Sequence, residues 1–87
     1  MMLDVAKVMR IVADVENRME FSFSSDEVAD TIRYTIRKCE LNGKDEDYFY
    51  LLFENELEDL IQRYYINLRG FINQMRKEEQ RCAKSAT

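Results

Sequence analysis

The stretch 45-DEDYFYLLFENELEDLIQRYYINLRGFINQMRKEEQR-81 holds most of the aromatic residues of the chain and contains no proline. Its apolar residues recur every three or four positions, a spacing that predicts one long amphipathic helix over about residues 46–82. They form two adjacent stripes: Phe53, Leu57, Leu60, Tyr64 and Phe71 on one, and Ile61, Tyr65, Leu68, Ile72 and Met75 on the other. Together the stripes make a face wider than the seam of a dimeric coiled coil.

The length of this helix raises the question of what covers it. At ~1.5 Å per residue it spans roughly 55 Å, whereas a compact chain of this size has a radius of gyration of about 12 Å. The rest of the chain is too short to shelter both stripes. Either the helix bends or breaks at Gly70, where glycine costs ~1 kcal/mol relative to alanine, or another copy of the chain covers its far half. The periodicity continues through Phe71 and Ile72, which favours the second copy.

The composition predicts an all-α fold. The chain has 87 residues, of which 46% are hydrophobic and 34% charged, with no proline and two glycines. These values are typical of a globular chain with few, long helices. We therefore expect a single helical domain over residues 1–87, with two shorter helices preceding a long C-terminal helix that is either straight or bent at Gly70. A domain this small has a marginal core of its own, and association is one way to reinforce it.

The first helix is predicted over about residues 4–20. Asp4 is a suitable N-cap, and Leu3 with Val8 has the spacing of a hydrophobic staple. The apolar residues step by three and four along the segment: Val5, Val8, Val12, Val15 and Met19. Because most of them are β-branched and weak helix formers, tertiary packing must stabilise this helix.

The second helix is predicted over about residues 25–41, because Ser24 and Glu27 have the spacing of a capping box. A narrow apolar stripe follows, formed by Val28, Ile32, Ile36 and Cys39. Gly43 is expected to end the helix in the left-handed conformation. Asp45 then caps the long helix, and the short connection turns the chain back on itself.

Charge is distributed unevenly along the chain. Residues 1–44 carry net charge −1, residues 45–62 carry seven acidic and no basic side chains, and residues 63–87 carry six basic and two acidic side chains. Acid at a helix start and base at its end complement the helix dipole. That explanation does not reach Glu54, Glu56, Glu58 and Asp59, which lie deeper in the helix.

The leading functional hypothesis is a non-enzymatic interaction module that forms an antiparallel homodimer through the long helix. In that arrangement the acidic segment of one copy faces the basic segment of the other, and both copies use the same surface. The predicted interface comprises Leu57, Leu60, Ile61, Tyr64, Tyr65, Leu68, Phe71, Ile72 and Met75.

A catalytic role finds little support in the sequence. The chain has no histidine and only two glycines, which removes the usual general base, the common zinc ligand and a glycine-rich phosphate loop. The pairs Glu54–Glu58 and Glu27–Asp30 resemble, in spacing only, the Mg²⁺-binding carboxylates of helical nucleotide pyrophosphohydrolases. In that family the Glu-x-x-Asp element follows the paired glutamates, whereas here it precedes them. This resemblance implies an alternative function as a Mg²⁺-dependent hydrolase. No cofactor is predicted otherwise.

A second alternative is a small acidic inhibitor that binds a basic partner, such as a nucleic-acid-binding protein. Its binding surface would comprise Asp45, Glu46, Asp47, Glu54 and Glu58. Direct binding to nucleic acid is disfavoured, because the helix after the tight turn at Gly43 opens with three acids that repel phosphate.

The two cysteines, Cys39 and Cys82, are far apart and lack the spacing of a metal site. The sequence has no signal-peptide pattern, and its longest apolar run, residues 48–53, is far shorter than a membrane span. We therefore expect a reduced, cytoplasmic protein without a membrane anchor.

Overall fold

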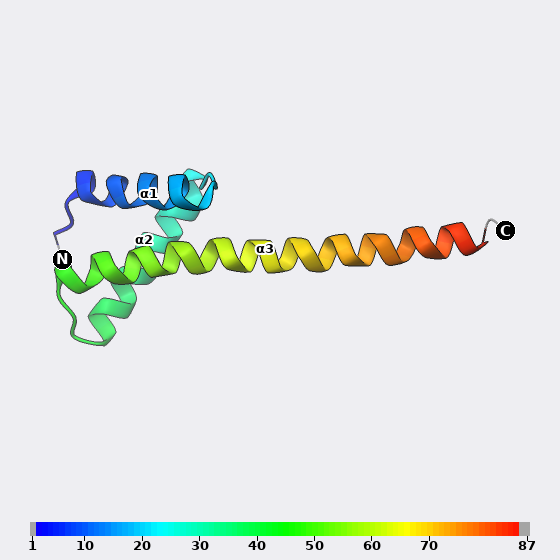
Figure 1. The fold of residues 1–87 in the computed structure, drawn as a ribbon. Helices are drawn as coiled ribbons and strands as arrows, with labels where there is room; N and C mark the ends of the chain where they lie inside the picture. Colours follow the sequence, from blue (N-terminus) through cyan, green and yellow to red (C-terminus); the bar gives the residue numbers. More distant parts are fainter. Residues whose placement is uncertain (1, 86–87) are drawn as a thin grey trace.

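The computed structural model of the chain describes the backbone of residues 2–85 and the side chains of residues 2–78. This part of the chain is all-α, with the helices α1 (Val5–Met19), α2 (Ser25–Leu41) and α3 (Glu46–Ser85) and no strand. Figure 1 shows α1 and α2 lying over the first half of α3, while the second half extends beyond them. The predicted fold class, two shorter helices followed by one long helix, is confirmed.

Helix α1 begins as predicted from its cap. The carboxylate of Asp4 accepts hydrogen bonds from the amides of Ala6 and Lys7, at 3.0 and 3.4 Å. The residues Val8, Val12 and Val15 are buried, as the spacing indicated. Val5, in contrast, leaves 73% of its surface exposed, so its assignment to the buried stripe is wrong. Val5 lies in the first turn of α1, one turn before Val8.

Helix α2 begins at Ser25, behind the predicted capping box. The Ser24 hydroxyl accepts from the Glu27 amide at 3.1 Å, and the Glu27 carboxylate accepts from the Ser24 amide at 2.9 Å. At its other end Gly43 has φ +61°, the left-handed conformation that was expected. There the amides of Gly43 and Lys44 donate to the carbonyls of Glu40 and Cys39, which satisfies the last turn.

Helix α3 begins after Asp45, whose carboxylate accepts from the Tyr48 amide at 3.1 Å. The helix then runs without interruption through Gly70 to Ser85, so the chain does not break at that glycine. The far half of the helix therefore does not fold back on the rest of the chain. Its apolar side chains therefore either pack against another molecule or stay exposed to solvent.

The core lies where α1 and α2 each pack against the first half of α3. Several side chains are completely buried there: Val15, Thr35, Cys39, Phe49, Phe53, Leu57 and Ile61. Thr35 is the one polar side chain among them, and its hydroxyl donates to the Thr31 carbonyl at 2.7 Å. That hydrogen bond removes the cost of burying the hydroxyl without a partner.

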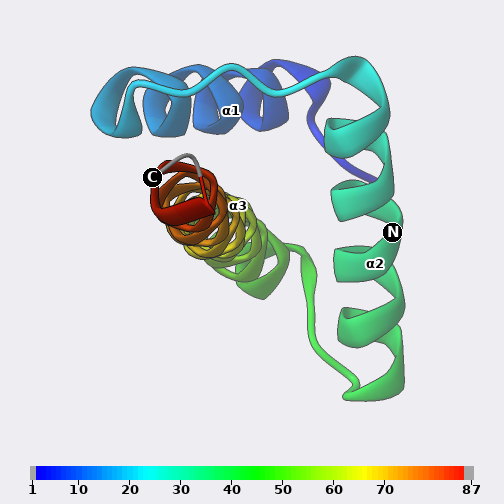
Figure 2. The ribbon, with the colours of Figure 1, turned by 90° about the vertical axis from the view of Figure 1, so that its right-hand side faces the viewer.

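The described part of the chain is elongated, with extents of 65 × 27 × 18 Å and a radius of gyration of 18.5 Å. We call residues 2–61 the body and residues 62–85, the second part of α3, the overhang. Viewed along α3, the body places α1 and α2 on two neighbouring sides of that helix (Figure 2). None of the three helices has an apolar stretch sufficient to cross a bilayer, as far as the structure describes them.

Candidate interaction surface

The overhang carries six large apolar side chains on one side. They repeat at the same helical spacing as the core residues before them, and each leaves between 38% and 62% of its surface in water. We call this surface the overhang face; it comprises Tyr64, Tyr65, Leu68, Phe71, Ile72 and Met75. Contiguous exposed apolar surface of this kind marks interaction sites in soluble proteins.

The first residues of the overhang face lie next to the connection between α1 and α2. The Phe21 ring lies 5.3 Å from the Tyr64 ring and 6.5 Å from the Tyr65 ring, in edge-to-face geometry. Leu60, one turn earlier, is partly buried. Beyond Tyr65 the apolar side chains that the structure describes on α3 are all exposed.

Three residues of the predicted interface, Leu57, Leu60 and Ile61, lie before the overhang and do not belong to this face. Leu57 and Ile61 are completely buried in the core that α3 makes with the rest of the same chain. They are therefore not exposed on the surface of the folded chain. Both predicted stripes continue without a break from these residues into the overhang, so periodicity alone could not separate the covered part of the helix from the free part.

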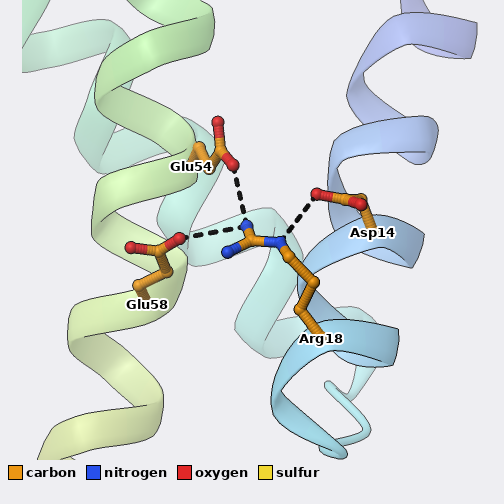
Figure 3. Close-up of polar contacts among 4 residues, drawn as sticks. All are labelled: Asp14, Arg18, Glu54 and Glu58. Carbon is orange, nitrogen blue, oxygen red and sulfur yellow. Dashed lines mark hydrogen bonds and ion pairs between the residues drawn. The ribbon is translucent and has the colours of Figure 1, made fainter.

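An ion cluster joins α1 to α3 on one side of the body (Figure 3). Arg18 lies 2.9 Å from Asp14, 2.7 Å from Glu54 and 3.0 Å from Glu58, in each case measured from nitrogen to oxygen. Hydrogen bonds to Asp14 and Glu58 raise the pKa of Arg18 above its ordinary value. These two glutamates of the acidic segment are thus paired with a cation of the same chain, although one arginine is shared by three carboxylates.

The other predicted acidic residues also have local roles. The Asp45 carboxylate caps α3, and Glu46 accepts a hydrogen bond of 2.8 Å from the Tyr50 hydroxyl. Only Asp47 has no such contact among the described residues. Four of the five residues predicted to bind a basic partner, all except Asp47, are therefore engaged in contacts within the chain.

Glu56 is engaged from α2. Its carboxylate lies 3.2 Å from the Lys38 ammonium, and this hydrogen bond, together with one to Tyr34, raises the pKa of Lys38 above its ordinary value. Arg18 and Lys38 thus supply the positive charge that the acidic half of α3 lacks. For these glutamates, α1 and α2 provide cations in the same chain, where the charge pattern predicted cations from a second copy.

The carboxylates considered for Mg²⁺ are likewise occupied. Glu54 and Glu58 share Arg18, Glu27 belongs to the capping box, and Asp30 pairs with Arg33 at 2.9 Å. Within the described residues no group of three or more potential ligands is arranged to hold a metal ion. The buried Cys39 thiol is surrounded by apolar side chains, and burial raises its pKa, which makes it a poor nucleophile.

The long-range contacts of Arg18 and Tyr50 were not anticipated. The Tyr50 hydroxyl accepts from the Asp4 amide at 3.0 Å while it donates to Glu46, and the Lys7 ammonium lies 4.2 Å from the Tyr50 ring centre. The spacing of Asp14 and Arg18 indicates a local pair. No signal in the sequence indicates which residues of another element Arg18 and Tyr50 contact.

Comparison with known proteins gives no relative: no family model, no curated protein and no solved structure matches this chain.

Proposed function

We propose that this chain is a non-enzymatic helical interaction module that forms a homodimer through its overhang. The observation that supports this proposal is the overhang face, whose six large side chains each leave between 38% and 62% of their surface exposed. A catalytic role has no comparable support, because the sequence has no histidine and the candidate carboxylates are engaged in caps and ion pairs.

An uncovered overhang is a costly arrangement. Most helical stability in proteins comes from packing of an apolar face, and the overhang also contains Gly70, which costs ~1 kcal/mol in a helix interior. Aromatic side chains bury about 150–250 Å² each when covered. Burying about 600 Å² of apolar surface between two chains contributes on the order of 15 kcal/mol before the costs of association. A partner therefore stabilises both the face and the helix that carries it.

A second copy is the partner that this geometry favours. Each chain brings the same uncovered face, so a two-fold arrangement covers two faces with one contact. The overhang face is rich in Tyr, Phe, Leu, Ile and Met, and aromatic residues and Met are enriched in interfaces. Its edge carries Arg69 and Arg76, which line the same surface hollow as Tyr65, Leu68 and Ile72.

Analytical ultracentrifugation tests the proposal directly. We expect the mass of a dimer at tens of micromolar and a shift towards monomer on dilution. A monomer at every concentration tested would end the proposal.

A pair of variants tests the surface. Phe71→Glu places a charge on the overhang face and should weaken the dimer at least about tenfold, as expected for a central aromatic contact. Ile66→Glu is the matched control. Ile66 is 68% exposed, but it points to a different side of α3 from the overhang face. Both variants should retain the helical circular-dichroism signal of the body. Equal weakening by both substitutions would show that the face is wrongly assigned.

A further inference from the structure

The body and the overhang face occupy the same side of α3. Phe53, Leu57 and Ile61 point into the core, and the spacing of three and four continues from Ile61 through Tyr64 to Leu68. In the view along α3, α1 and α2 lie over this side, near the start of the helix (Figure 2). A partner seated on the overhang face therefore shares that side with the body.

This placement restricts the direction of the partner. In a parallel dimer both bodies would lie at the same level and between the same two helices. Their α1 and α2 helices would then compete for one space and hold the overhangs apart. In an antiparallel dimer the bodies lie at opposite ends, and the two overhang faces can meet without that conflict.

Net charge favours the same direction. Residues 1–62 carry fifteen acidic and seven basic side chains, whereas residues 63–87 carry six basic and two acidic ones. A parallel pair places the acidic bodies together and the basic overhangs together. An antiparallel pair points each basic overhang towards the acidic body of the other copy. Such charge complementarity mainly fixes orientation and the rate of association.

We infer that the second copy lies antiparallel on the overhang face, so that each overhang ends beside the α1–α2 connection of the other body. This inference rests on the proposed self-association. It replaces the pairing of whole α3 helices, because α1 and α2 already cover the first half of α3 and pair with Glu54, Glu56 and Glu58. The contact extends from the overhang face to the surroundings of Glu20 and Phe21, where Phe21 already packs on Tyr64 and Tyr65.

A distance between bodies tests the direction. A spin label at Asp47→Cys, in a Cys82→Ser background, reports on the start of α3, while the native Cys39 is buried and does not react. If each overhang ends beside Tyr64 of the other copy, the two-fold axis passes near Gln74, and an antiparallel dimer separates the labels by about 80 Å, from ~1.5 Å per residue. A parallel dimer separates them by a distance comparable to the 27 Å width of the molecule.

The outcomes separate this inference from the proposal on which it depends. A long distance supports the antiparallel dimer. A short distance overturns it and leaves self-association intact. A monomer by sedimentation overturns both.

Charge reversal gives an independent test. Arg76→Glu combined with Lys77→Glu makes the overhang acidic, and both residues are exposed on the free part of α3. An antiparallel dimer should weaken several-fold, because the overhang then meets a body of like charge. A parallel dimer should tighten, because the repulsion between the two basic overhangs disappears. Adding Glu20→Lys to this double variant should restore part of the lost affinity. If the double variant does not weaken the dimer and Glu20→Lys does not strengthen it again, the inference is overturned.

Discussion

The two halves of α3 have similar apolar patterns and opposite surroundings. In the first half Phe49, Phe53, Leu57 and Ile61 are completely buried. In the second half Tyr64, Leu68 and Phe71 follow at the same spacing, yet Phe71 leaves 62% of its surface in water. The difference lies in the neighbours, because α1 and α2 together cover only the first four turns of the helix.

The comparison also separates two uses of charge. The carboxylates of the first half neutralise Arg18 and Lys38 and thereby attach α1 and α2 to α3. The basic residues of the second half, among them Arg69, Arg76 and Lys77, make no ion pair within the described side chains. In the body, charged side chains therefore hold the helices of one chain together. On the overhang, these basic side chains are free to interact with another molecule.

Replacing a phenylalanine by alanine should destabilise the two halves of α3 very differently, and this is the largest effect that we expect. Phe53→Ala removes a fully buried ring and should lower the free energy of unfolding by about 3–5 kcal/mol. Phe71→Ala creates no cavity in the monomer, so at concentrations where the chain is monomeric its effect should be small. Urea unfolding of dilute protein, followed by circular dichroism, measures both. Equal losses would mean that Phe71 is also packed inside one chain.

The sequence was sufficient to predict the parts of the fold that depend on local chemistry. The capping box of Ser24 and Glu27, the left-handed Gly43 and the caps Asp4 and Asp45 were all placed correctly. Each of these features depends on residues within a few positions of one another. Glu20, with φ 50°, was missed because a non-glycine residue gives no signal for that conformation.

The extent of the interface could not be predicted in the same way. Leu57 and Leu68 have the same residue type and lie on the same side of α3, but only Leu57 is covered by the body. Which turns of a helix are covered depends on where α1 and α2 pack, and that depends on contacts between distant residues such as Arg18 with Glu54. For the same reason the charge pattern indicated a partner for carboxylates that pair with Arg18 and Lys38 of the same chain.

A pH dependence is expected in the body and not in the overhang. Burial raises the pKa of the Cys39 thiol above its ordinary value of 9.0, with smaller contributions from the nearby charges of Asp45 and Glu40. The folded chain thus keeps this proton to higher pH than the unfolded chain. Stability should be unaffected below pH 9.0 and should fall as the pH rises above it.

Urea unfolding between pH 8 and pH 10 measures this fall, and Cys39→Ala is the control. The variant should be less stable at neutral pH, because it has a smaller buried side chain, but its stability should decline less with pH. The window ends near pH 10 because Tyr50 then begins to contribute. The Asp4 amide favours its phenolate, yet burial and the hydrogen bond to Glu46 leave its pKa raised above 10.0. Parallel curves for the two proteins would contradict the role of Cys39.

A smaller effect is expected from the ion cluster. Arg18→Met leaves Asp14, Glu54 and Glu58 close together without their cation, so α1 should separate more readily from α3. Hydrogen exchange should become faster in α1 and remain unchanged in the overhang. Arg33→Met is the matched control, because its ion pair with Asp30 is exposed and should contribute little. Added salt should partly restore the Arg18 variant by screening the three carboxylates.

The smallest expected effects concern the two glycines, one in each part of the molecule. An added Cβ meets no atom within 4 Å at either Gly43 or Gly70, so space does not distinguish them. Gly43 has φ +61°, where alanine costs about 1–2 kcal/mol. Gly70 is helical, and alanine there should stabilise the overhang by up to ~1 kcal/mol. Gly43→Ala should therefore lower the melting temperature of the body, while Gly70→Ala should raise the helical signal and tighten the dimer. If Gly70→Ala instead weakens the dimer, position 70 lies inside the contact, and the partner covers more of the helix than the overhang face.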